Sequence, residues 1–165
     1  MVEYRITKYD PSLRDANGAY MRHDWISISD IGKSFKGEVL TAEEYQRVED
    51  AYVATVLGFL DESGVATLCV TGLESWGNSS LVEGQSISCG EVPSILRSLL
   101  REEIWCRLES QEVFVHVGYD YYLYVGSSRE CPLTEGLAAE LGLFAERFSS
   151  PYKEAQSDQP DDGRT

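Results

Sequence analysis

Ile104 to Gly126 reads IWCRLESQEVFVHVGYDYYLYVG and predicts three short strands joined by tight turns. Alternate side chains of a strand point to opposite faces. One face would therefore be apolar: Ile104, Cys106, Leu108, Val113, Val115, Val117, Tyr121, Leu123 and Val125. The other would mix aromatic and polar groups: Trp105, Arg107, Phe114, His116, Tyr122 and Tyr124. We expect the first face to be core and the second to be covered by a helix or a partner.

A long helix is predicted upstream of these strands. Thr41 to Glu44 has the form of a capping box, and apolar side chains then recur at spacings of three and four as far as Leu60. Ser63-Gly64 provides a stop signal. The opposite face of this helix would carry acidic residues, which we expect to be solvated: Glu43, Glu49, Asp50 and Asp61.

Shorter elements follow from the same periodicities. Residues 3–9, 66–71 and 84–89 alternate well enough to predict strands. Pro93 suits the first turn of a helix that ends near Leu100. A last helix starting near Pro132 would bury a stripe made of Leu137, Leu141, Phe144 and Phe148.

Residues 12–36, here called the N-terminal connection, are long for a loop, and Trp25 to Ser29 is a candidate strand within them. The order β, loop, α, β, β, α, β, β, β, α predicts an α+β domain, with a mainly antiparallel sheet of about five to six strands and two to three helices. Residues 1–152 would form this single domain. Residues 153–165 would form a disordered acidic tail.

Charge is the strongest compositional signal. The 165 residues include 14 lysines and arginines against 28 acidic residues, a formal net charge of −14. Such a field repels nucleic-acid phosphates and anionic membranes and attracts basic proteins. We therefore expect no nucleic-acid or membrane partner. The N-terminus lacks a signal-peptide pattern, and the four cysteines are scattered, which predicts a cytoplasmic protein with free thiols.

Motifs of the common enzyme classes are absent from the sequence. It contains no GxGxxG, GxxxxGK[ST], HExxH or GxSxG, so we expect no metal and no cofactor. The most enzyme-like group is His116 beside Tyr119, Asp120, Tyr122 and Tyr124, because histidine titrates near neutrality and tyrosine can donate to an oxyanion. A hydrogen-bonded structural histidine is the competing interpretation, and the one we favour.

A tyrosine-rich acidic surface is typical of protein recognition, because tyrosine offers rigid contact area and carboxylates steer a basic partner. Trp76, in the loop GLESWGNSSLVE, either caps the edge of the core or is an exposed interface anchor. The candidate partner-binding residues are Asp24, Trp25, Asp30, Trp76, His116, Asp120, Tyr122 and Tyr124.

Five stretches carry a family resemblance: YRITKYDP (4–11), DWISISDIGKSF (24–35), GEVLTAEEYQRVEDAY (37–52), FVHVGYDYYLYVGSS (114–128) and FSSPY (148–152). They resemble the immunity proteins of bacterial contact-dependent growth inhibition and related polymorphic-toxin systems. The resemblance implies a cytoplasmic protein that binds a cognate toxin C-terminal domain, often a nuclease with a basic surface, and blocks it without catalysis. Alternatives are a small enzyme that reverses a toxin modification near His116, and an acidic nucleic-acid mimic.

Overall fold

The computed structural model describes residues 1–153, and the predicted disorder of the tail therefore falls almost wholly outside the described residues. Its strands are β1 Val2–Thr7, β2 Ser34–Phe35, β3 Glu38–Val39, β4 Thr67–Ser75, β5 Ser86–Ser88, β6 Ile104–Glu109, β7 Val113–Val117, β8 Leu123–Ser127 and β9 Phe144–Arg147. Its helices are α1 Ala42–Ser63, α2 Val92–Leu100 and α3 Pro132–Glu140, with short 3-10 turns at Pro11–Leu13 and Ile28–Asp30. None of the helices within residues 1–153 is long and apolar enough to cross a membrane.

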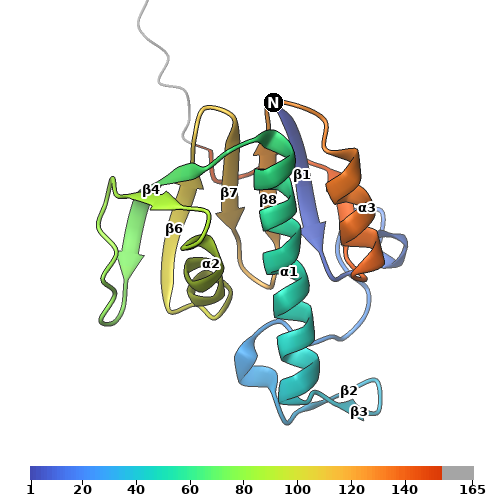
Figure 1. The fold of residues 1–165 in the computed structure, drawn as a ribbon. Helices are drawn as coiled ribbons and strands as arrows, with labels where there is room; N and C mark the ends of the chain where they lie inside the picture. The colour runs from blue at the N-terminus through green and yellow to red at the C-terminus, as the bar shows by residue number, and fades with distance from the viewer. Residues whose placement is uncertain (154–165) are drawn as a thin grey trace, which may run out of the picture.

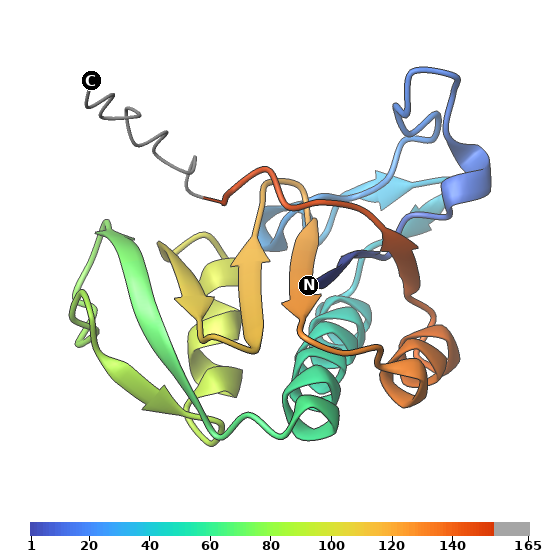
Figure 2. The same cartoon turned by 90° about the horizontal axis from the view of Figure 1, so that it is seen from above.

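The main sheet has seven strands in the order β5-β4-β6-β7-β8-β1-β9, and every neighbouring pair is antiparallel. The three helices lie on one face of it (Figures 1 and 2). β2 and β3 form a separate two-stranded ribbon. The predicted α+β class with an antiparallel sheet is confirmed.

The core lies between the helices and the predicted apolar face of the sheet. All nine residues assigned to that face from Ile104 to Val125 are buried, none more than 6% exposed. Alternation in these three strands was therefore sufficient to predict the core face. The four cysteines are free, and Cys106 and Cys131 are buried within this core.

The boundaries of α1 agree with the prediction. Thr41 Oγ1 accepts a hydrogen bond from the Glu44 amide at 3.1 Å, which caps the first turn. The Glu44 carboxylate binds Arg47 instead of completing a capping box. At the other end Gly64 adopts a left-handed φ of 69°, which glycine tolerates at low cost.

One residue of the predicted solvated face of α1 is in fact buried. Glu49 is 0% exposed and lies between α1 and α2. Its carboxylate accepts hydrogen bonds from Arg97 at 3.0 Å and from Arg101 at 2.9 and 3.1 Å. The prediction was wrong for Glu49 because α2, which covers this side of α1, leaves no mark on the local sequence pattern.

The predicted last helix is also shorter than expected. α3 ends at Glu140, and Gly142, with φ +80°, turns the chain out of the helix. Phe144 then begins β9, which pairs with β1, and Phe148 is exposed. The apolar spacing that suggested a continuous helix is interrupted because the chain reverses at Gly142. The candidate strand at residues 25–29 is likewise absent, and a 3-10 turn begins at Ile28.

Most of the mixed face of the sheet is covered by the chain's own C-terminal segment, residues 148–153, which we call the C-terminal strap; Tyr122 packs against Tyr9 instead. It crosses the sheet on the side away from the helices (Figure 2). The Ser150 hydroxyl lies 2.7 Å from His116 Nδ1, and its amide donates to Glu3 at 3.1 Å. Arg107 donates to the Tyr152 carbonyl at 3.4 Å. Within the described chain, the cover is therefore neither a helix nor a partner.

Gly126 is required by the ring that lies against it. It stands opposite Phe114 in the β7–β8 register, and a methyl group added there would overlap the Phe114 ring. We expect Gly126→Ala to lower the free energy of unfolding by about 2 kcal/mol through overpacking, measured by urea denaturation. Gly136→Ala is the matched control, because open space surrounds that helical position and stability should rise by about 0.5–1 kcal/mol. Equal effects of the two substitutions would contradict this account.

Candidate functional site

A groove of about 610 Å³ opens where β4, β6 and β7 reach one end of the sheet. Four aromatic residues from four segments line it: Trp76 after β4, Trp105 in β6, Tyr119 in the β7–β8 turn and Tyr152 in the strap. The remaining lining residues are Leu99, Ile104, Val117, Gly118 and two carboxylates, Glu74 and Glu102. Among the described residues that line it there is no lysine, arginine or histidine. We call this the acidic aromatic groove.

A bulge in β4 directs Trp76 toward the groove. The register of β4 with β6 shifts between Thr71 and Glu74, and bulges of this kind change the direction in which a strand end projects. The Glu83 carboxylate accepts hydrogen bonds from the Leu73 amide at 2.7 Å and the Gly72 amide at 2.9 Å, which holds its pKa below the usual range. Trp76 then lies 67% exposed, so it does not cap the core.

Two rings form a fixed wall of the groove. Trp105 donates from Nε1 to the Val117 carbonyl at 3.0 Å, and its ring lies 5.8 Å from that of Tyr152. A Cβ at position 118 would come within 2.9 Å of the Tyr152 hydroxyl, so Gly118 makes room for this ring. Trp105 and Tyr152 are both half-buried, in contrast to Trp76.

The ring of Tyr119 is 74% exposed and belongs to a strained turn. Asp120 and Tyr121 adopt φ values of 58° and 63°, which non-glycine residues rarely do. Tyr9 donates to the Asp120 carbonyl at 2.7 Å, and Tyr52 donates to the Tyr121 carbonyl at 2.8 Å. Burial raises the pKa of both hydroxyls well above 10, so both remain donors. The core therefore holds the turn that presents Tyr119.

Glu102 occupies a position where helices usually place glycine. It follows the C-terminus of α2 with φ 60°, and its amide donates to the Leu99 carbonyl at 3.1 Å. The Glu103 amide donates to the Ser98 carbonyl at 3.0 Å, which completes a Schellman motif. A left-handed conformation costs an L-residue roughly 1 kcal/mol, and here it places a carboxylate on the rim of the groove.

We expect Glu102→Gly to raise the free energy of unfolding by about 0.5–1 kcal/mol, because glycine adopts the left-handed turn without steric cost. Urea denaturation checks this. Glu103→Gly, at the next exposed position, has φ outside that region and should gain nothing. A loss of stability in Glu102→Gly would mean that the carboxylate itself supports the fold.

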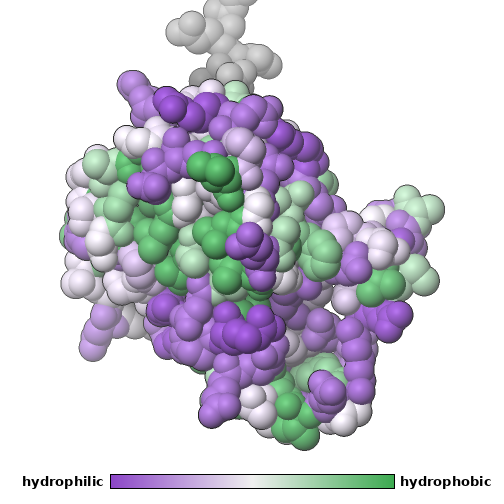
Figure 3. Space-filling view, turned by 45° about the vertical axis from the view of Figure 1, so that its right-hand side comes forward, coloured by the Kyte–Doolittle hydropathy of each residue, from purple (hydrophilic) through white to green (hydrophobic). Residues whose placement is uncertain are grey.

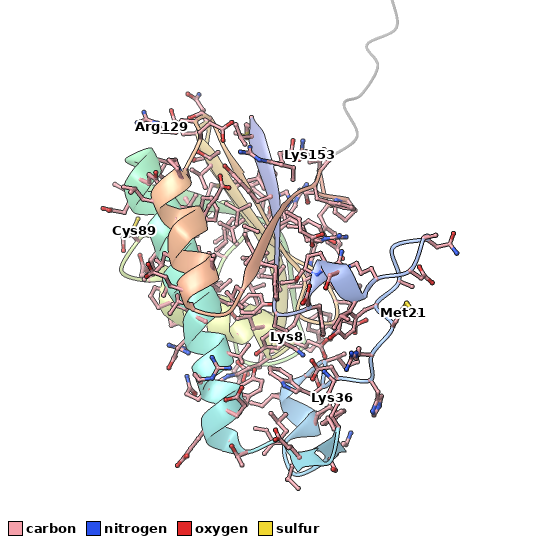
Figure 4. All side chains as sticks on the ribbon, turned by 90° about the vertical axis from the view of Figure 1, so that its right-hand side faces the viewer. Lys8, Met21, Lys36, Cys89, Arg129 and Lys153 are labelled. Carbon is pink, nitrogen blue, oxygen red and sulfur yellow. The ribbon has the colours of Figure 1, made fainter. Side chains whose placement is uncertain are left out.

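The structure gives three predicted residues of the N-terminal connection internal roles. Asp24 forms an ion pair with Lys8 at 3.2 Å, and the Lys8 ammonium lies 4.0 Å from the centre of the buried Trp25 ring. Burial, opposed by Asp24, lowers the pKa of Lys8 to about 8. Figure 4 shows Lys8 between α1 and the N-terminal connection. Asp30 is buried and accepts from the Ile26 amide at 2.9 Å and the Ser27 amide at 3.3 Å; the second bond completes a capping box in which Ser27 is the N-cap of the 3-10 turn.

Part of the predicted set does come together beside the groove. Asp24, Asp120 and Tyr122 line a hollow of about 180 Å³, and its other lining residues are Tyr9, Tyr20, Arg22 and Ile26. Asp120 is exposed and adjacent in sequence to Tyr119. The hollow and the acidic aromatic groove therefore both border the β7–β8 turn.

His116 and Tyr124 lie beneath the strap, at 1% and 8% exposure. His116 Nε2 is 3.0 Å from Glu109, so a neutral ring that donates there accepts from Ser150 at Nδ1. This serine, histidine and glutamate order resembles a catalytic relay, but the Ser150 hydroxyl is buried and lies in the strap. The arrangement supports fixation of the strap, which is the structural interpretation of His116.

The pH dependence of stability tests this role. Burial, opposed by Glu109, holds the pKa of His116 below its ordinary value of 6.5. At pH values between the folded and unfolded pKa, the unfolded chain binds more protons than the folded chain. The contribution of neutral His116 to the free energy of unfolding is therefore complete above about pH 6.5 and declines as the pH falls. The stability difference between the wild-type protein and His116→Gln should shrink from about pH 7.5 to about pH 5.5, as urea denaturation would show. His23→Gln is the control, and a difference that grows would contradict the assignment.

Exposed aromatic residues distinguish the groove from the rest of the surface. Within residues 1–153 the exposed large hydrophobic residues include three aromatic ones, Trp76, Tyr119 and Phe148, and two of them line the groove. Figure 3 shows a hydrophobic area near the centre of its face, framed by hydrophilic residues. On α3 the exposed hydrophobic residue is aliphatic, Leu133. Leu133 therefore offers no aromatic ring to a partner.

Sequence reasoning identified Trp76 but missed three other groove residues: Glu102, Trp105 and Tyr152. Tyr119 was noted only as a neighbour of His116. These groove residues lie at the ends of strands or in turns, a feature that the sequence shows. That they lie close together in space depends on the order of strands in the sheet, which the sequence does not show. Within residues 1–153 no group of three or more histidine, cysteine or acidic side chains could hold a metal ion.

Fold and site together define an antiparallel α+β domain with an acidic aromatic groove. No protein-family model, curated protein or solved structure matches the chain. Function is therefore inferred from the geometry of the groove and the charge of the chain.

Proposed function

We propose that this protein is a non-enzymatic inhibitor that binds a basic protein domain, in the manner of an immunity protein that neutralises a cognate toxin domain. The observation that carries the proposal is the acidic aromatic groove, with Trp76 and Tyr119 exposed and carboxylates at its rim. Tryptophan and tyrosine dominate the energy of protein interfaces when a partner buries them. The resemblance of the sequence to immunity proteins supports the same class of partner.

Charge supports a basic partner. The groove lining contains carboxylates and no basic side chain, and the whole chain has a net charge of −14. Such a field accelerates encounter with a positively charged surface and discriminates against acidic ones. A nuclease active site, which must attract phosphates, would present that kind of surface.

The interface would extend from the groove across the β7–β8 turn to the hollow beside Asp120. A stable interface buries about 800 Å² per partner, more than the groove alone offers. The exposed Asp120 would then lie at its rim, next to Arg22 and the ion pair between Asp24 and Lys8. His116 and Tyr124 would support the strap from below.

The test is a titration of the partner's activity. The protein is purified at low ionic strength from cells that produce it, bound proteins are identified, and a basic domain found in this way is assayed with increasing amounts of inhibitor. We expect activity to fall linearly and vanish at one equivalent. Protection at far below one equivalent would instead indicate an enzyme that reverses a modification.

A nucleic-acid mimic makes a different prediction in the same assay. It would inhibit several unrelated nucleic-acid-binding proteins, and polyanions would compete with it for each of them. We expect one partner to be inhibited and the others to be unaffected. Inhibition of an unrelated panel would overturn the proposal of a single cognate domain.

A further inference from the structure

The acidic aromatic groove combines the two groups that bind organic cations. Rings from four segments surround it, and Glu74 and Glu102 lie on its rim. The face of an aromatic ring carries negative charge, so a cation held over it is attracted, most strongly over tryptophan. Carboxylates near such rings add charge-assisted hydrogen bonds to the same cation.

The chain already uses this interaction with its own cations. The Arg5 guanidinium lies 4.0 Å from the centre of the Phe148 ring, and the Lys8 ammonium lies 4.0 Å from that of Trp25. Arg5 also binds the Glu146 carboxylate through two nitrogens, each at 3.2 Å. A ring, a guanidinium and a carboxylate thus form one internal unit, and the groove presents the ring and carboxylate parts of such a unit without a basic lining residue.

We propose that the groove is a cage for an arginine side chain of the partner, an inference that rests on the proposed function. Arginine fits better than lysine for two reasons. Its planar guanidinium can stack on one ring while it donates to a carboxylate at its edge, whereas an ammonium is a point charge that retains water strongly. The half-buried rings of Trp105 and Tyr152 and the exposed rings of Trp76 and Tyr119 all line the groove, and they supply the aromatic groups for such stacking.

The groove is larger than one side chain, at about 610 Å³, and its floor is apolar, with Leu99, Ile104 and Val117. The arginine would therefore be flanked by apolar residues on an exposed loop of the partner. Glu102 would be a specificity-determining residue, since its strained backbone places the carboxylate on the rim.

The indole signals of the three tryptophans provide a direct test by nuclear magnetic resonance. The probe is a blocked Leu-Arg-Leu tripeptide, added to the full chain up to about 10 mM, where a millimolar dissociation constant gives near saturation. We expect the signals of Trp76 and Trp105 to shift and that of the buried Trp25 to stay, with signals assigned by Trp→Phe variants. Blocked Leu-Lys-Leu should bind more weakly, and Leu-Gln-Leu weakest. Equal shifts with all three peptides, or no shift with the arginine peptide, would overturn the proposal.

Two matched double variants separate charge from shape. Glu74→Gln with Glu102→Gln keeps the size of the rim and should weaken the arginine peptide about tenfold without changing the glutamine peptide. Glu112→Gln with Glu140→Gln removes the same charge from exposed positions before β7 and at the end of α3, and should change neither. Equal weakening by both pairs would show that net charge, not the cage, attracts the peptide.

The outcomes also distinguish this inference from the proposed function. If the arginine peptide binds in the groove but the protein inhibits no basic domain, the arginine cage is supported and the inhibitor role is contradicted. The opposite outcome is a protein that inhibits its partner at one equivalent, with or without Trp76→Ala, but does not bind the arginine peptide. That result would support the inhibitor role and contradict the arginine cage.

Discussion

Glu49→Gln is expected to lower the free energy of unfolding by about 2–3 kcal/mol. The carboxylate is fully buried and accepts three hydrogen bonds from Arg97 and Arg101. Removing one partner of a fully buried ion pair costs about 3–5 kcal/mol, because the remaining charge is left without compensation. Here both arginine side chains are 30% exposed, so water can take part of that role and the loss should be smaller.

Urea denaturation measures this loss, with Glu43→Gln as the control. Glu43 lies on the same helix but is exposed, and such substitutions usually change stability by less than about 0.5 kcal/mol. Equal stability of the two variants would show that the buried charge contributes nothing. The contact between Glu49 and Arg101 also lies next to the groove, because Arg101 is the C-cap residue of α2 and directly precedes Glu102.

Glu74→Lys with Glu102→Lys is expected to slow association with the basic partner by about 10- to 100-fold at low ionic strength. The two carboxylates are the charged groups of the groove lining, so reversing them places repulsion at the point of encounter. Stopped-flow association rates over a range of salt concentrations measure the effect. The dependence of the rate on salt should weaken at the same time.

The control reverses Glu112 and Glu140 instead. Each Glu→Lys change adds two charges, so either pair changes the net charge from −14 by +4 to −10. Glu112 precedes β7, at the opposite end of that strand from the groove, and Glu140 ends α3 near β9 at the far edge of the sheet. A similar slowing by both pairs would show that overall charge steers the partner and that the groove has no special part.

Local patterns predicted most elements of the fold. Alternation assigned the core face of β6, β7 and β8, and the Thr41 and Gly64 signals bounded α1. These features depend on neighbours two to four positions apart, which are visible along the chain. The same local view extended the last helix as far as Phe148, because apolar spacing does not reveal where a glycine reverses the chain.

The candidate site was less accessible to sequence reasoning. Trp76 was recognised because a tryptophan in a polar loop is unusual, whereas Tyr152 and Glu102 gave no comparable signal. His116 was seen on a mixed face, but its cover, Ser150, lies 34 residues further along the chain. Glu49 was placed in solvent because its partners on α2 are 48 and 52 residues away.

The sequence by itself determined the class of fold, the core face of the central strands and the acidity that favours a basic partner. Those properties follow from residue periodicity and from summed charge, neither of which requires knowledge of long-range contacts. Only the tertiary structure decided which aromatic residues are exposed and which are covered by the strap. It also decided that rings from β6, two loops and the strap meet in one groove, because the order of strands in the sheet brings together segments that are distant along the chain.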